Sequence, residues 1–141
     1  MTNCLAILLL ILPVDEARIL DRVAKQYKLT TEQTYVLAAI RKTENGPTGL
    51  EFGIGQEYPG HKATRYKHSP ARSFWIQARW AAGTVAKRYT GDVPALARIY
   101  CPKNHEVWAQ NVRYWMNKQM EWERRKSESI RGNSTHAEDA G

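Results

Sequence analysis

Two carboxylates, Glu44 and Glu51, lie in the stretch IRKTENGPTGLEFGIGQ, which covers residues 40–56 and directly follows an expected helix. Glu44 comes one helical turn after Ile40 and therefore continues the apolar face of that helix. Partial burial disfavours a charged carboxylate, and the negative end of the helix dipole acts in the same direction. Both effects favour a carboxyl group that keeps its proton near neutral pH, as a general acid must. The position predicts an acid rather than a cap, because capping carboxylates belong at the other end of a helix.

The residues after Glu44 favour this interpretation over the commoner one, a solvated charge in a last turn. The stretch contains four glycines, among them Gly53, and glycine lets the backbone approach a ligand closely. The side-chain amide of Gln56 can both donate and accept hydrogen bonds. Phe52 offers an aromatic face for a sugar ring. An acid, a glycine-rich loop and an aromatic residue together predict a glycosidase-like site.

Helical segments surround this loop. Apolar residues recur at helical spacing, which predicts a mostly helical domain with an irregular segment over residues 47–69 that contains at most a short hairpin. The expected helices cover residues 15–27, 31–43, 70–89, 93–100 and a last segment from 105.

Capping signals mark the ends of these helices. Thr30 and Gln33 have the spacing of a capping box. Asn45-Gly46-Pro47 is a strong stop signal, because Asn or Gly can adopt the left-handed conformation and Pro cannot continue a helix. Ser69-Pro70 is typical of a helix start, and Asp92 can cap the following short helix. The stop signal fixes Glu44 at the edge of the loop.

The chain of 141 residues divides into three parts. Residues 1–14 are apolar and form either a signal segment or a first helix. No basic residue precedes the apolar run and no A-x-A cleavage site follows it, so the sequence favours neither reading. Residues 15–122 form the expected catalytic domain. Residues 123–141 are polar, and we expect a disordered tail because they bury little apolar surface.

Charge and composition limit the partners. There are 21 Lys and Arg against 14 Asp and Glu, a net charge of +7, which suits a polyanion such as nucleic acid, an anionic membrane or the bacterial wall. The basic residues are spread along the chain instead of being gathered on one recognition helix, which disfavours nucleic acid. The cysteines and histidines show no zinc-ligand spacing, and we expect neither a metal nor a cofactor.

Three short motifs resemble the lysozyme-like superfamily of soluble lytic transglycosylases and goose-type lysozymes, especially small phage and bacterial wall-degrading domains. AIRKTENG places Glu44 where that family has its catalytic glutamate at a helix end. Residues 53–56, GIGQ, resemble the family's G-x-x-Q segment. Tyr100 in ALARIYCP is the candidate for the aromatic residue that faces the glutamate. Asn45 stands where a serine often follows the acid. The resemblance covers roughly residues 15–120.

The resemblance implies a mainly α (α+β, lysozyme-like) fold in which the loop or a short hairpin forms one wall of a saccharide cleft. It implies a monomeric glycosidase that cleaves the β-1,4 bond between N-acetylmuramic acid and N-acetylglucosamine in peptidoglycan. Glu44 would be the acid and base, and the substrate-binding residues would be Glu51, Phe52, Gly53, Gln56 and Tyr100.

Several alternatives stay open at this stage. The product is either hydrolytic or a 1,6-anhydro sugar. Glu51 is either a residue of the groove or a second essential carboxylate. Tyr100 is either a core residue or a cleft residue. The route to the wall is periplasmic, secreted or phage-delivered. A nucleic-acid-binding module and an inactive wall-binding domain are the alternative functions.

Overall fold

The computed structural model describes residues 4–55 and 68–139, and all regular elements in these ranges are helical. The helices confirm the mainly α class, whereas no strand occurs in the described ranges, so the allowed hairpin is not found over residues 47–55. The elements are α1 (Leu5–Leu8), α2 (Val14–Gln26), α3 (Thr31–Glu44), α5 (Pro70–Arg88), α6 (Val93–Tyr100), the 3₁₀ turn η1 (Pro102–Asn104) and α7 (His105–Asp139).

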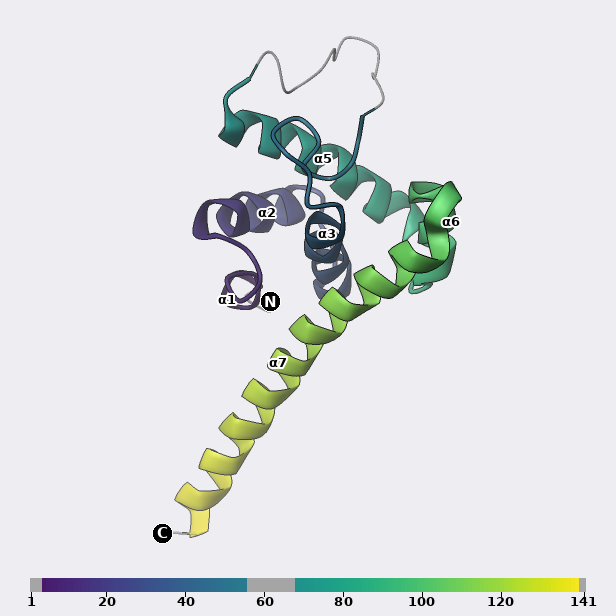
Figure 1. The fold of residues 1–141 in the computed structure, drawn as a ribbon. Coiled ribbons are helices and arrows are strands. Elements are labelled where there is room, and N and C mark those ends of the chain that lie inside the picture. Colours follow the sequence, from purple (N-terminus) through teal and green to yellow (C-terminus); the bar gives the residue numbers. More distant parts are fainter. Residues whose placement is uncertain (1–3, 56–67, 140–141) are drawn as a thin grey trace.

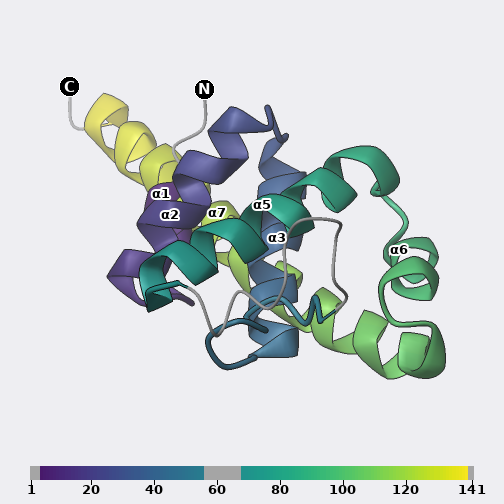
Figure 2. The same cartoon turned by 90° about the horizontal axis from the view of Figure 1, so that it is seen from above.

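Helix α3 is the centre of the domain. Every residue from Thr34 to Ile40 is buried, so this helix is covered on all sides. Helices α2, α5 and α7 pack around it, and α6 packs against the start of α7 (Figure 1, Figure 2). Because Glu44 ends this central helix, its position is fixed by the core of the whole domain.

The local signals at the helix ends are confirmed. Thr30 and Gln33 form the reciprocal capping box at the start of α3. Asn45 ends α3 with φ of 46°, in the left-handed conformation that the stop signal predicts. Ser69 and Asp92 each accept a bond from a backbone N–H of the helix that they cap. Asn45 and Ser69 mark the two ends of the irregular segment between α3 and α5.

The N-terminal apolar run lies against the domain. Helix α1 packs on α2 and α7, and its side chains Ile7 and Leu8 are buried together with Leu12. Within the described ranges, no helix combines the length and apolar character that crossing a bilayer requires. In the structure this run is a short first helix.

The last helix differs from the sequence-based expectation. Residues from 123 were expected to form a disordered tail, whereas α7 continues to Asp139. Its C-terminal end extends beyond the other helices (Figure 1). Arg125 and Glu121 form an exposed ion pair one turn apart at 2.6 Å, a contact that supports helix without tertiary packing. The structure therefore shows helix where the low apolar content of the sequence predicts disorder.

Tyr89, at the end of α5, is expected to lower the stability of the fold at alkaline pH. Burial raises the pKa of its phenol to about 12, and the nearby charge of Glu32 acts in the same direction. The contribution to stability is complete below the unfolded pKa of about 10 and is lost as the pH rises through the folded value. We expect Tyr89→Phe to lose less unfolding free energy than the wild type between about pH 9 and about pH 11. Equal losses in denaturant titrations at the two pH values would contradict this.

Candidate active site

Residues 46–55 form an irregular loop that folds back on itself. The Leu50 N–H donates to the Pro47 carbonyl at 2.8 Å, and the Gly53 N–H donates to the Leu50 carbonyl at 2.9 Å. Such tight turns leave most backbone groups of the loop without the ladder partners that a hairpin would supply. Side chains from neighbouring helices supply those partners instead.

Gln77 of α5 is the main polar anchor of the loop. This side chain is fully buried and bonds to three separate loop residues. Its Nε2 donates to the carbonyls of Gly49 at 3.1 Å and Ile54 at 2.9 Å, while its Oε1 accepts from the Phe52 N–H at 3.3 Å. A buried amide that is satisfied in this way holds the loop in one conformation.

Glu51 lies inside the loop, with only 4% of its surface exposed. Its Oε1 accepts from the Gly49 N–H at 2.6 Å and from the Ser73 hydroxyl at 3.1 Å. These partners are groups of the protein itself, and the carboxylate organises the turn that contains it. The placement favours a structural role for Glu51 over contact with a sugar or a water nucleophile.

Arg41 ties the loop to the other side of the domain. Its guanidinium donates to the carbonyls of Gly46 and Glu51, each at 3.1 Å, and to Glu16 Oε1 on α2 at 2.6 Å. The Arg41–Glu16 pair is largely shielded from solvent. The backbone after Glu44 is therefore fixed by α2 and α3 as well as by α5.

Glu44 is half-buried, and its carboxyl group is held from α7. The indole N–H of Trp108 donates to Glu44 Oε1 at 2.9 Å. Trp108 is itself buried, and a buried indole N–H requires an acceptor. Oε1 is therefore engaged with Trp108, and Oε2 lies on the side of the loop at Gly53.

Gly53 brings the loop backbone into contact with that second oxygen. A Cβ atom at this position would lie 2.3 Å from Glu44 Oε2, a distance that only glycine avoids. The φ of Gly53 is +72°, which also favours glycine. The sequence predicts that the glycines of this loop let the backbone approach a ligand; at Gly53 the close approach in the structure is to the side chain of Glu44.

Tyr100 links the loop to Trp108. Its ring stacks on the indole with centroids 5.0 Å apart and an angle of 22° between the planes. Its hydroxyl donates to the Phe52 carbonyl at 2.6 Å. Glu44, Trp108, Tyr100 and the segment from Phe52 to Gly53 thus form a closed circuit of contacts around the acid.

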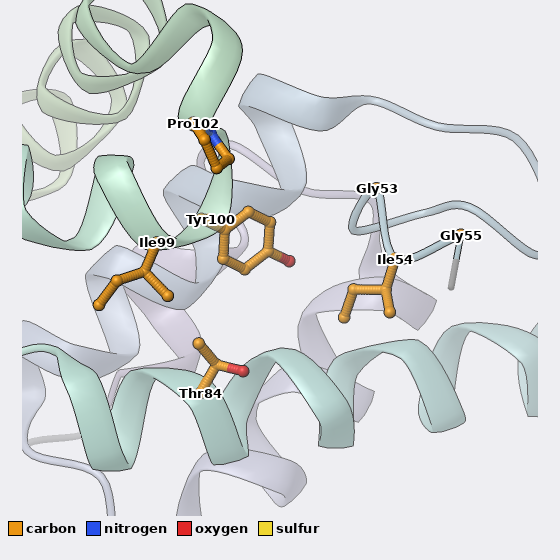
Figure 3. Close-up of a pocket in the computed structure, with 7 residues that line it drawn as sticks. All are labelled: Gly53, Ile54, Gly55, Thr84, Ile99, Tyr100 and Pro102. Carbon is orange, nitrogen blue, oxygen red and sulfur yellow. The ribbon is translucent and has the colours of Figure 1, made fainter. Parts of the chain in front are cut away.

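A cavity of about 410 Å³ lies beside this circuit. Its volume is within the range of about 300–1,000 Å³ that is usual for ligand sites. In Figure 3 the side chain of Tyr100 points toward the loop residues, and Thr84 of α5 lies on another side. Gly53 belongs both to the wall and to the packing of Glu44, so the acid lies directly behind the wall. The described lining residues are Gly53, Ile54, Gly55, Thr84, Ile99, Tyr100 and Pro102.

The structure divides the expected substrate residues into three groups. Gly53 and Tyr100 lie at the cavity. The side chains of Glu51 and Phe52 are buried. The Phe52 ring packs on the Phe74 ring, with ring centroids 5.3 Å apart, instead of facing the cavity. Gln56 lies outside the described residues. Phe52 contributes through its carbonyl, which orients Tyr100.

Sequence reasoning missed two residues of the site. Gln77 lies one turn after Ser73 and one turn before Ala81, and this polar pair on an otherwise apolar helix face was the available signal. The other is Trp108, because no local pattern in the sequence indicates where its N–H points. Among the described residues, no group of three or more histidine, cysteine or acidic side chains could hold a metal ion.

Comparisons with known proteins give no assignment: no family model, curated protein or solved structure matches the chain.

Gln77 yields the first prediction for the site. Gln77→Leu removes the three hydrogen bonds that this side chain makes to Gly49, Phe52 and Ile54. We expect a loss of roughly 2–4 kcal/mol in the free energy of unfolding, measured by denaturant titration. The matched control is Gln119→Leu, the other fully buried glutamine, which bonds to Tyr35 and Trp115 far from the loop.

Hydrogen exchange separates the two variants. Gln77→Leu should increase exchange at the loop amides, such as that of Phe52, at a denaturant concentration where both variants remain folded. Gln119→Leu should leave these amides protected. Unchanged protection in Gln77→Leu would show that the amide does not hold the loop.

Proposed function

We propose that the protein is a peptidoglycan glycosidase that cleaves the β-1,4 bond between N-acetylmuramic acid and N-acetylglucosamine, with Glu44 as its general acid and base. The observation that carries this proposal is the constrained carboxyl group of Glu44, which lies directly behind the lining residue Gly53. One oxygen of Glu44 is bonded to Trp108, and the other lies against Gly53. Fixing a carboxyl group in one orientation reduces the entropic cost of aligning it with a glycosidic oxygen.

The first step is proton transfer from Glu44 Oε2 to the glycosidic oxygen. The bond between this oxygen and the muramoyl C1 breaks, and the N-acetylglucosamine portion leaves with the proton. Positive charge develops at C1, where the acetamido oxygen of the same sugar can stabilise it. Glu44 is then a carboxylate that still accepts the Trp108 N–H, and it is ready to act as a base.

The second step returns the proton to Glu44. Either water or the C6 hydroxyl of the muramoyl residue attacks C1 and gives up its proton to the carboxylate. The first nucleophile gives a hydrolysed product and the second gives a 1,6-anhydro product. Glu51 is buried and bonded within its own loop, so the described site offers a single carboxylate for these steps. This arrangement favours participation of the substrate's acetamido group over a mechanism with two carboxylates.

Tyr100 and the loop backbone would position the sugar. The Tyr100 ring presents an apolar face at the cavity, and its orientation is fixed by Trp108 and by the Phe52 carbonyl. The exposed backbone of Gly53 and Gly55 leaves room for polar ring substituents. The net charge of +7 suits approach to an anionic wall.

Replacement of the acid tests the proposal directly. Glu44→Gln keeps an oxygen for the Trp108 N–H but has no acidic proton, so the fold should be retained. We expect release of muropeptides from isolated murein to fall by about 10²–10⁴-fold, as measured by mass spectrometry. The matched control is Glu51→Gln, which keeps an acceptor for Gly49 and Ser73 and should remain active.

Either of two results would overturn the assignment of Glu44. Glu44→Gln could release muropeptides at the wild-type rate, or Glu51→Gln could be the variant that loses activity. Absence of release by the wild type would remove the glycosidase proposal itself. In an active preparation, a product lighter by one water than the hydrolysed one identifies attack by the C6 hydroxyl.

Gly53 supplies a second test of the geometry. In Gly53→Ala the new methyl group collides with Glu44 Oε2, so the carboxyl group must shift from its position beside Trp108. We expect activity on murein to fall by up to about 10²-fold, because displacement of a catalytic group by about 1 Å can have that effect.

Gly91→Ala is the matched control for Gly53→Ala. Gly91 has a φ of +105°, so alanine there introduces comparable backbone strain, but no atom lies within 4 Å of the new methyl group. Gly91→Ala should be destabilised and still active at a temperature where both variants are folded. Equal activity in the two alanine variants would show that the contact between Gly53 and Glu44 has no catalytic importance.

A further inference from the structure

A second hollow, of about 440 Å³, adjoins the candidate active site. Thr84 and Ile99 line both cavities, so the two hollows share a wall. The second hollow is formed mainly by one face of α5, together with the end of α2 and the end of α6. Its described lining residues are Tyr27, Arg79, Trp80, Gly83, Thr84, Lys87, Arg88 and Ile99.

The charged residues of this hollow are all cations. Arg79, Lys87 and Arg88 contribute positive charge, and no carboxylate belongs to the described lining. Within the part of the chain that the structure describes, none of the three forms an ion pair with an acidic side chain. The Arg79 guanidinium lies 4.5 Å from the centre of the Trp75 ring, a contact that leaves its charge uncompensated. The hollow therefore favours an anionic ligand.

Apolar surface accompanies this charge. Tyr27, Trp80 and Ile99 line the same hollow, which suits a ligand that carries aliphatic side chains as well as acidic groups. An acidic peptide has this combination of properties, whereas an inorganic anion has no use for the apolar part. Because the hollow adjoins the other cavity, a peptide that binds in the hollow can be covalently attached to a ligand that binds in the other cavity.

We propose that this basic hollow, defined by Arg79, Lys87, Arg88, Tyr27 and Trp80, binds the carboxylate-bearing peptide stem of the glycan strand. The inference rests on the proposed function, since it requires a muramoyl residue in the adjacent cavity. The stem is attached to that sugar through its lactyl group. Binding of the sugar brings the stem carboxylates to the hollow at high effective concentration, so modest ionic contacts suffice.

Binding to catalytically inactive protein tests the inference. In Glu44→Gln protein, calorimetry would compare a murein disaccharide that carries its peptide with the same disaccharide without a peptide. Adding Arg79→Gln and Arg88→Gln should weaken binding of the peptide-bearing ligand by roughly tenfold and leave binding of the bare disaccharide unchanged. The matched control replaces Arg113 and Arg124, two exposed arginines of α7 outside both cavities, by Gln.

Three results would overturn the inference. The Arg79 and Arg88 replacements could weaken peptide-ligand binding no more than the control does. They could weaken binding of the two disaccharides equally, while the midpoint temperature of thermal unfolding stays unchanged. They could also leave the peptide ligand unaffected and abolish binding of a single-stranded oligonucleotide, which would assign the hollow to nucleic acid.

The murein assay keeps this inference separate from the proposed function. If wild-type protein cleaves murein while the hollow does not discriminate the two ligands, only the peptide-stem inference fails. If the protein binds the peptide-bearing ligand through Arg79 and Arg88 but cleaves nothing, the glycosidase proposal fails alone.

Discussion

The hydrogen bond from the Trp108 indole to Glu44 is the interaction on which the site depends. It joins the last turn of the central helix to the first turns of α7, and it fixes which oxygen of the carboxyl group faces the loop. Tyr100 then stacks on the same indole and holds the Phe52 carbonyl. Gly53 follows Phe52 and completes the circuit against Glu44.

The loop is kept in place by buried polar groups and not by a sheet. Gln77, Arg41 and Glu51 satisfy backbone atoms that a hairpin would pair within itself. Networks of this kind are rigid when complete and costly when one member is lost. This explains how a short, glycine-rich segment can present its backbone at a cavity wall and still have a defined conformation. The rigid loop fixes the position of Glu44 relative to the cavity wall.

The local features of this arrangement can be predicted from the sequence, whereas its tertiary contacts cannot. The capping box at Thr30, the stop at Asn45 and the position of Glu44 follow from neighbouring residues, and each is found as expected. The roles of Glu51 and Phe52 depend on which way their side chains turn in the fold, and nearby residues do not determine that. The helix beyond Trp122 is not predicted by apolar content, because its residues bury little apolar surface; the Glu121–Arg125 ion pair is a local contact at its start.

Nuclear magnetic resonance of the tryptophan indole N–H groups tests the central claim most directly. Trp108→Phe identifies the Trp108 signal in the spectrum of Glu44→Gln protein. If Glu44 stands at a saccharide site, a soluble murein disaccharide should shift that signal and leave the signal of Trp122, which lies beside α1 and outside both cavities, unchanged. A Trp108 signal that does not respond at saturating ligand, or a response confined to other tryptophans, would contradict the account.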